Sequence, residues 1–405
     1  MSRPVVAALA CWIGAIAPAH AQIVLTLEET LTRAREQSGA VALARARVAE
    51  ADAAVIDASV RFRENPVIET GLGPRRGGGT TMSEIDVSVS QQFETGGQRQ
   101  ARIGAARAAV DRQRAEVTLA ARDGVFAAAS AFLAGVAAAD RLRLAGASAD
   151  VSRRLLAATD RRFAAGDVAA IDLNLARIDA ARAEAAVQSA RTDLAAVADR
   201  LRILLRLPAA DPIELRGSLE PTAIPPLEQL ESMVSGRPEL AVLAADAREA
   251  DAQIQLGRAQ ARPDLGVQVA YQREETDTIV MGGLTVTLPA FQMGQGAVAS
   301  GMARATRIGL EAELARQRAL GELRSAYALH AGRVALVQML ARDALPSVAD
   351  NEALAQRSYE AGEMSLMDLL LVQRHALDVR LLVIERQLEA AQARLDVDFA
   401  SGELR

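Results

Sequence analysis

One long motif occurs twice in the amino-acid sequence, and this duplication limits the folds that the chain can adopt. Arg161-Arg162-Phe163-Ala164-Ala165-Gly166 precedes Asp172, and Arg357-Ser358-Tyr359-Glu360-Ala361-Gly362 precedes Asp368 in the same way. Further pairs keep a nearly constant separation: Glu50-Ala51-Asp52-Ala53 with Glu249-Ala250-Asp251-Ala252, Asn65-Pro66 with Arg262-Pro263, and Gly96-Gly97 with Gly294 and Gly296. Two copies of about 190 residues predict a pseudo-symmetric fold in which each copy supplies a helix, a strand pair, a helix, a glycine turn and a helix.

The first 21 residues have the organisation of a secretory signal. Arg3 supplies a positive charge, Val5 to Ile16 form an apolar core, and Ala19-His20-Ala21 is a cleavage site of the small-x-small type. A lipoprotein signal cut before Cys11 is the alternative, but it requires a bulky aliphatic residue where the chain has Ala8. Because Cys11 is the only cysteine, cleavage after the signal leaves a chain without disulfides or thiol chemistry.

The composition favours an exported, helical protein that does not bind nucleic acid. Apolar residues make up 50% of the chain but aromatic residues only 3%, because alanine, the strongest helix former, supplies most of the hydrophobicity. No stretch after the signal approaches the run of about 18 apolar residues that indicates a transmembrane helix. The net charge is −5, and no basic run with interleaved aromatics indicates a nucleic-acid surface.

Two segments, 66–92 and 264–289, change from a helical rhythm to a two-residue rhythm. Within the first, Ile85, Val87 and Val89 alternate with polar residues, which predicts a strand with one apolar and one polar face. Each predicted strand has about eight to ten residues, close to the ~9–11 that cross a bilayer at a tilt. A soluble hairpin packed on a helix gives the same pattern, but the signal and the matching pair of hairpins favour a membrane barrel. Three phenylalanines fall where strands meet helices, as an interfacial girdle requires: Phe62, Phe93 and Phe291.

Long helices occupy the rest of both copies. No proline interrupts residues 97–163, and about 67 residues at 1.5 Å each reach roughly 100 Å. The counterpart covers residues 296–359 with a kink predicted at Pro346, and a helix over residues 25–64 is expected to break near Ser38-Gly39. Helices of this length have to line up in an assembly, because no compact domain accommodates them.

These elements divide the chain into a signal, two copies and a proline-rich linker. The expected boundaries are 1–21 for the signal, 22–207 for the first copy, 208–226 for the linker and 227–405 for the second copy, with tip turns at 163–172 and 359–368.

The order of elements and the duplicated motif resemble the TolC family of outer-membrane efflux channels, over essentially all of the predicted mature chain. The resemblance implies a mainly α fold with a membrane β part. Long antiparallel helices would form a trimeric periplasmic α-barrel, and four strands per protomer a twelve-stranded trimeric β-barrel. It also implies a passive duct in the outer membrane with a long periplasmic extension. The implied partners are two further copies in a homotrimer, outer-membrane lipid, a periplasmic adaptor (membrane fusion protein) and an inner-membrane pump of the RND type.

In this family each periplasmic tip carries an aromatic-x-x-Gly turn followed by an aspartate, and both tips of this sequence match. The first tip has Phe163, Gly166 and Asp172, and the second has Tyr359, Gly362 and Asp368. The resemblance implies that the aromatic and glycine positions of both turns dock the adaptor. It also implies that the aspartates belong to a periplasmic gate, in which Asp368 rings the closed entrance.

Two positions depart from the best-known member of the family. Leu371 stands in place of a second gate aspartate and Met364 in place of a gating arginine, so the closed-state network is simpler here or is built from Arg161 and Arg357. Both tip aspartates also fit an ordinary role as acids in the first turn of a helix, and both glycines as turn residues. Three copies of Asp368 around a threefold axis would repel one another, which favours a gate role for that residue.

The strand-to-helix corners resemble one branch of the family, the outer channels of cobalt–zinc–cadmium efflux systems. The first corner is Gln92-Phe93-Glu94-Thr95-Gly96-Gly97-Gln98-Arg99. The second is Leu288-Pro289-Ala290-Phe291-Gln292-Met293-Gly294-Gln295-Gly296, in which Met293-Gly294 replaces the Arg-Asn pair of that branch. The resemblance implies heavy-metal cations as the transported solute.

No residue pattern indicates catalysis, a cofactor or a metal site made by the protein. His20 leaves with the signal, and His330 and His375 have no second ligand at i+3 or i+4, so both are expected to be packed or solvated helix residues. The rival function is a soluble periplasmic coiled-coil adaptor or scaffold. An adaptor would carry one helical hairpin among several β domains, and a scaffold would not need paired alternating strands.

Overall fold

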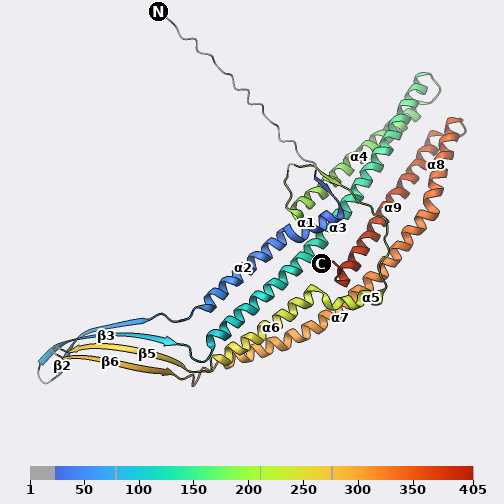
Figure 1. Ribbon diagram of the computed structural model, residues 1–405. Helices are drawn as coiled ribbons and strands as arrows, with labels where there is room; N and C mark the ends of the chain where they lie inside the picture. Colours follow the sequence, from blue (N-terminus) through green and yellow to red (C-terminus); the bar gives the residue numbers. More distant parts are fainter. Residues whose placement is uncertain (1–22, 78–79, 210, 275–276, 405) are drawn as a thin grey trace, which may run out of the picture.

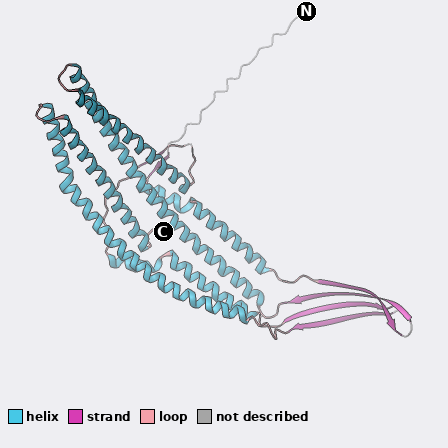
Figure 2. Ribbon diagram, turned by 180° about the vertical axis from the view of Figure 1, so that it is seen from behind, coloured by secondary structure: helices cyan, strands magenta, loops and turns pink. Residues whose placement is uncertain are grey.

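The computed structural model describes residues 23–404, apart from 78–79, 210 and 275–276, as an elongated and curved molecule (Figure 1). A bundle of helices occupies most of its length, and a sheet projects from one end (Figure 2). The predicted signal, 1–21, lies outside the described residues. The first half of the chain forms β1 (Ile23–Leu25), α1 (Leu27–Gln37), α2 (Gly39–Ser59), β2 (Val67–Gly77), β3 (Thr80–Phe93), α3 (Gln98–Ala164), α4 (Ala170–Leu205) and β4 (Ile213–Leu215). The second half forms α5 (Leu227–Met233), η1 (Val234–Gly236), α6 (Pro238–Ala259), β5 (Asp264–Glu274), β6 (Asp277–Thr287), α7 (Gln295–Met339), the π-helical turn η2 (Leu340–Ala344), α8 (Leu345–Glu360) and α9 (Leu366–Ser401).

The four long strands form one antiparallel sheet in the order β2-β3-β5-β6. The two hairpins join along β3 and β5, where Val87 lies opposite Tyr271 and Val89 opposite Val269. The central strands therefore come from different copies of the repeat. The outer strands β2 and β6 each have one neighbour among the described strands, so both edges of the sheet are open.

The helices form two groups along the molecule. Near the sheet, α2 packs on α3, α3 on α6 and α6 on α7, so α2 and α7 are the outer members of this group. Toward the other end, α3 pairs with α4 and α8 with α9, and each of these hairpins closes in a tip turn (Figure 1). The predicted unbroken helix is present, because α3 has 67 residues.

The largest hydrophobic core lies where the linker between the two copies crosses the bundle. Phe132 of α3 is 1% exposed and packs with Leu201 and Leu205 of α4. A two-stranded parallel sheet, β1 with β4, packs against this core and places Ile23 opposite Ile213. The sequence did not predict β4 inside the linker 208–226, since a strand of three residues is too short to show an alternating pattern.

One helix ends earlier than its sequence pattern predicts. α2 stops at Ser59 rather than near Glu64, because Arg99 of α3 donates from Nη2 to the Ser59 carbonyl oxygen at 2.7 Å and from Nε at 3.0 Å. These bonds occupy a carbonyl oxygen of the last turn, which in a longer helix would accept a backbone N–H from the following turn. The predicted break at Ser38 is confirmed, since its side chain caps the start of α2.

The predicted kink at Pro346 is also confirmed. α7 ends at Met339, the π-helical turn η2 follows, and Pro346 lies in the first turn of α8. A proline ring clashes with the carbonyl of the preceding turn, and the wider π turn relieves that clash. α7 begins at Gln295, one residue before the predicted start at Gly296.

The expectation that no stretch after the signal approaches a transmembrane helix was wrong. Among the described helices, only α3 contains a stretch long and apolar enough to cross a membrane. Within that stretch, 56% of the residues are buried inside the protein. The burial is that of a core helix, whose alanine-rich surface lets neighbouring helices approach closely.

Candidate functional site: a two-faced sheet and two tip turns

The four-stranded sheet has an apolar face that nothing in the described chain covers. Residues directly opposite one another in an antiparallel pair point to the same side, so the register assigns each side chain to a face. One face carries Ile68, Leu72, Ile85, Val87, Val89, Leu265, Val267, Val269, Tyr271, Val280, Leu284 and Val286. These side chains are largely exposed: Leu72 by 81% and Leu284 by 76%. An apolar surface of this extent indicates contact with lipid or with another protein.

The opposite face is polar and acidic. Among the residues whose side chains the structure describes, it carries five carboxylates and no arginine. The carboxylates belong to Glu69, Glu84, Asp86, Asp264 and Asp277. Gln272 on the same face donates from Nε2 to Glu84.

Each strand pair returns to the helices through a glycine corner, and the two corners share one conformation. Gly97 precedes α3 with φ +81°, and Gly294 precedes α7 with φ +68°. The glutamine that follows, Gln98 or Gln295, accepts from the backbone N–H two residues before it, at 2.7 Å and 2.6 Å respectively. Gly97 therefore corresponds to Gly294. The match of Gly296 to this corner was wrong, because the turn needs a single left-handed residue before the helix and Gly296 is the second residue of α7.

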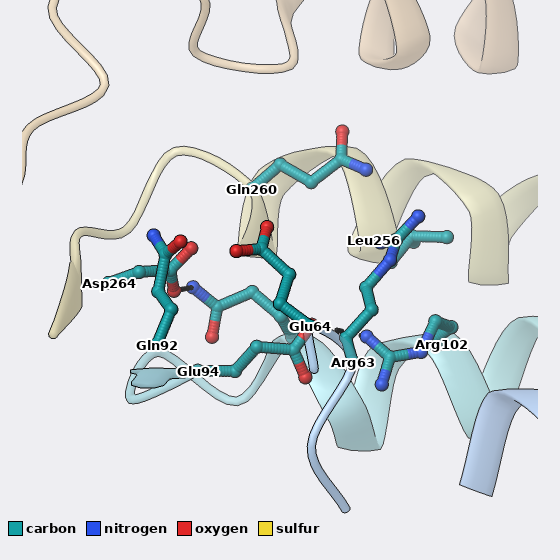
Figure 3. Close-up of a pocket in the computed structure, with 9 residues that line it drawn as sticks. Arg63, Glu64, Gln92, Glu94, Arg102, Leu256, Gln260 and Asp264 are labelled. Carbon is teal, nitrogen blue, oxygen red and sulfur yellow. Dashed lines mark hydrogen bonds and ion pairs between the residues drawn. The ribbon is translucent and has the colours of Figure 1, made fainter. Parts of the chain in front are cut away.

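A cavity of about 280 Å³ lies beside the first corner (Figure 3). It is lined by Arg63, Glu64, Gln92, Glu94, Gln98, Arg102, Leu256, Gln260 and Asp264. Arg102 of α3 forms an ion pair with Glu94, and Gln98 donates from Nε2 to Asp264 Oδ1 at 2.9 Å. These bonds connect the start of α3 to the ends of β3 and β5, so they fix the direction in which the sheet leaves the bundle.

The two predicted tip turns are alike in backbone conformation. Gly166 has φ +81° and Gly362 has φ +78°. In each turn the N–H of the next residue donates to the carbonyl five residues earlier, at 2.8 Å in the first tip and 2.9 Å in the second. This is the hydrogen bond of a Schellman helix end. No atom lies within 4 Å of the position of a Cβ on either glycine, so both turns face open space.

The aromatic residues of the two tips have different surroundings. Phe163 is 41% exposed, whereas Tyr359 is half-buried against a hydrophobic cluster that joins the two hairpins. The buried members of that cluster are Leu155, Ala176, Ala355, Leu366 and Leu369, and Met364 packs against it.

The structure brings the tips together through a residue that the sequence did not select. Arg162 donates from Nη1 to the Tyr359 hydroxyl at 3.4 Å, and its guanidinium lies 5.8 Å from the centre of the tyrosine ring. The predicted candidates Arg161 and Arg357 do not make this contact, and Arg357 donates from Nε to a carbonyl of its own helix at 3.1 Å. The sequence does show two adjacent arginines before Phe163, but their positions do not reveal which of them faces the second hairpin.

Both tip aspartates lie in the first turn of a helix. Ser365 caps α9: its Oγ accepts from the Asp368 N–H at 3.2 Å and donates to Asp368 Oδ2 at 2.7 Å. Asp172 has the same place in α4, whose N-cap residue is Ala169. Within the described part of one protomer, no ion pair joins either aspartate to an arginine. A gate role therefore depends on neighbouring subunits.

The two histidines outside the signal are helix residues, as predicted. His330 is 4% exposed, and its Nε2 atom has no hydrogen-bond partner. Burial lowers the pKa of the His330 imidazole, and nearby Arg394 lowers it further. His375 is exposed. Across the described ranges, no group of three or more His, Cys, Asp or Glu side chains could hold a metal ion.

Outer-membrane proteins are among the known proteins that this chain resembles. Residues 230–403 match the family model of the outer membrane efflux protein. The sequence is 27% identical to the cobalt-zinc-cadmium resistance protein CzcC of Cupriavidus metallidurans, over 95% of this chain and 92% of the relative.

Solved structures share the fold. CusC matches with a TM-score of 0.73 at 16% identity, covering 93% of this chain and 92% of that one. The outer-membrane channel CmeC of Campylobacter jejuni matches with a TM-score of 0.70 at 15% identity, covering 93% and 85%. The outer membrane protein VceC of Vibrio cholerae matches with a TM-score of 0.69 at 16% identity, covering 93% and 96%.

Proposed function

We propose that this chain belongs to the outer membrane efflux protein family, and that three copies of it form the exit duct of a tripartite efflux system that carries divalent metal cations. The protein lies in the outer membrane, and its helices extend into the periplasm. The duct is passive. Energy for transport comes from an inner-membrane pump of the RND type, which a periplasmic adaptor connects to the tip turns.

The two-faced sheet with two open edges is the observation that carries this proposal. In a bilayer every backbone N–H and C=O needs a partner, so a sheet survives there only when it closes on itself. If β6 of one subunit pairs with β2 of the next, three sheets of four strands give a closed ring with no edge. The apolar faces then meet lipid, and the acidic faces line the lumen.

The outer helices support the same assembly. Leu43 and Ile56 of α2 are 58% and 70% exposed, and Leu310 and Leu314 of α7 are 63% and 50% exposed. α2 and α7 are on opposite sides of the row of helices that continues from the sheet. A ring in which α7 of one subunit packs against α2 of the next buries both apolar surfaces by one repeated contact.

The acidic face supports cations as the transported class. Three subunits would place three copies of Glu69, Glu84 and Asp86 around the lumen of the ring. Fixed negative charges in a narrow, low-dielectric channel concentrate cations and repel anions. The similarity to a protein named for cobalt, zinc and cadmium resistance favours divalent metals within that class.

Removing these charges is expected to reduce cation selectivity. A variant with Glu69→Gln, Glu84→Gln and Asp86→Asn should have a severalfold lower cation-to-anion permeability ratio, measured from reversal potentials across a planar bilayer under a salt gradient. Ser88→Asn is the matched control, since it adds bulk to the same face without changing charge. An unchanged ratio in the triple variant would contradict selection of cations by the sheet.

Cell fractionation distinguishes the proposed channel from the rival function as a soluble periplasmic scaffold. The channel is expected in the outer membrane as a heat-modifiable oligomer. Release of the whole population with the periplasmic contents would contradict the proposed duct.

Asp368 is proposed as the gate residue, where three symmetry-related carboxylates would converge. Asp368→Ala is expected to raise single-channel conductance and to weaken block by divalent cations, because the mutual repulsion and the cation site both disappear. Ser365→Ala separates this role from helix capping, since it removes the cap but keeps the carboxylate. Equal conductance changes in both variants would assign the effect to the cap and refute the gate.

A further inference from the structure

We infer that Arg61 binds the phosphate of anionic phospholipid headgroups in the periplasmic leaflet, with Phe62 as the apolar part of the same anchor. The inference rests on the proposed function, because it requires the sheet to cross the membrane. It adds a lipid-binding surface at the base of the sheet and names the lipid chemistry that this surface selects.

Aromatic packing places Phe62 on the outward side of the molecule. Phe62 and Phe93 form an edge-to-face pair with ring centres 5.5 Å apart and planes at 82°. Phe93 lies opposite Leu265, so it belongs to the apolar face of the sheet. The Phe62 ring, 46% exposed, therefore extends that face beyond the ends of the strands.

Arg61 lies next to this outward ring. Its guanidinium carbon is 5.7 Å from the centre of the Phe62 ring, within the range of a cation–π contact. Arg61 and Phe62 are both exposed. The charge thus lies beside the lipid-facing surface rather than in the lumen or in the polar cavity of Figure 3, which neighbouring Arg63 lines.

The length of the apolar face gives the depth of this anchor. On β5 the face runs from Leu265 to Tyr271, and the next residue on that side is Arg273. The eight residue steps from Leu265 to Arg273 span about 27 Å along a strand, or about 20 Å across the membrane at a tilt of roughly 40°. The Phe62 ring, centred 5.5 Å from that of Phe93, extends this band toward the ~25 Å of lipid-facing barrels. Arg273 then marks one boundary of the hydrocarbon and Arg61 the other.

Arg61 is available for a ligand, unlike Arg99 and Arg102 nearby. Arg99 and Arg102 of α3 donate to backbone carbonyls at the end of α2, and Arg102 also pairs with Glu94. Within the described part of the chain, Arg61 forms no hydrogen bond or ion pair with the protein. Its guanidinium makes a cation–π contact with the Phe62 ring. A planar guanidinium at the headgroup level matches a phosphate through two parallel hydrogen bonds.

A single tryptophan at position 62 tests both the depth and the lipid preference. Trp12 is the only tryptophan in the sequence and lies in the predicted signal, so Phe62→Trp made in a Trp12→Phe background has a single tryptophan in each chain. The full-length trimer would be reconstituted into vesicles of phosphatidylethanolamine and phosphatidylglycerol at three to one. In separate samples, one of the two lipids would carry bromine near the headgroup end of its chains.

We expect brominated phosphatidylglycerol to quench the introduced tryptophan more than its share of the mixture predicts. Adding Arg61→Ala should lower the ratio of the binding constants for phosphatidylglycerol and phosphatidylethanolamine at this position by about fivefold, the effect of one interfacial cation on anionic lipid. Arg191→Ala, an exposed arginine of α4 far from the sheet, should leave it unchanged. The proteins with and without Arg61 carry the same Phe62→Trp substitution, so any difference in quenching between them comes from the Arg61 charge and not from the introduced tryptophan.

The failures are distinguishable. Quenching by both lipids in proportion to their amounts, unchanged by Arg61→Ala, would overturn the lipid-binding inference and leave the membrane-spanning sheet intact. No quenching by either lipid would place position 62 in water and would overturn the lipid-binding inference, while cell fractionation decides separately whether the proposed channel stands.

Discussion

Replacing Gly362 with leucine is expected to abolish metal efflux while leaving the trimer assembled. The Cβ of a new side chain would meet no atom within 4 Å, so the substitution causes no clash inside the protomer. Its folding cost is the left-handed backbone at φ +78°, about 1–2 kcal/mol for a residue other than glycine. The leucine would project from the tip turn into the surface proposed to dock the adaptor, where close backbone approach requires the absence of a side chain.

The measurement is growth on zinc, cobalt or cadmium salts of cells that depend on this channel, together with the amount of trimer in the outer membrane. Gly362→Asn is the control for backbone strain, since asparagine tolerates the left-handed region. Gly146→Leu is the control for bulk, because Gly146 lies within α3 and also has open space around its Cβ position. Normal growth of the Gly362→Leu strain would remove the docking role of this turn. Loss of the trimer would mean that the turn serves assembly instead.

Replacing Glu239 with glutamine is expected to destabilise the protein by about 3 kcal/mol, because it breaks ion pairs with two buried arginines. Glu239, near the start of α6, accepts from two buried arginines. Arg122 of α3 is 3% exposed and Arg237 is 5% exposed. Neutralising the carboxylate leaves two buried positive charges close together. Their remaining carboxylate acceptors are Glu322, at 3.1 Å from Arg237, and Asp123, at 3.2 Å from Arg122.

This ion-pair network joins the two copies of the repeat. Arg122 comes from the first copy and also lies 4.1 Å from the ring of Phe399 in α9, while Arg237 donates to the carbonyl of Ala400 at 3.4 Å. Burial by itself would raise the pKa of the Glu239 carboxyl, but hydrogen bonds from Arg237 and Arg122 hold that pKa below its ordinary value of 4.5. The stability that Glu239 contributes is therefore present above pH 4.5 and is lost as the pH falls through its lower folded value.

Guanidinium unfolding of the detergent-solubilised protein, followed by circular dichroism, measures this effect. Glu311→Gln is the matched control, because its pair with Arg307 is exposed on α7 and is worth about 0.3–0.5 kcal/mol. The Glu239→Gln midpoint should move several times further than that of the control. Equal shifts would mean that the buried network contributes no more than a surface pair.

Local sequence patterns predicted the elements that depend on short-range physics. The two-residue alternation around Val87 predicted β3, the lack of proline after Gly97 predicted a 67-residue helix, and Pro346 predicted a kink. Each of these features follows from backbone and side-chain sterics within a few residues. The recurrence of the tip motif also predicted two equivalent turns, and both have the same hydrogen bonds.

Features that depend on contacts between distant segments were not predictable from one sequence. The early end of α2 depends on Arg99, forty residues later in the chain. The contact of the second tip with Arg162 rather than Arg161 depends on how the two hairpins rotate against each other. The equivalence of Gly97 with Gly294 depends on which glycine takes a positive φ, and a match between two sequences carries no information about dihedral angles.

The sequence alone determined the duplicated order of helices and strands, because hydrophobic period, proline and glycine act locally. Only the tertiary structure decided which side chains form one apolar face across the four strands. It also decided that Arg99 and Arg102 donate to backbone carbonyls, while Arg61 stays exposed beside Phe62. Those outcomes are set by strand register and helix packing between residues far apart in the chain, and no local pattern records them.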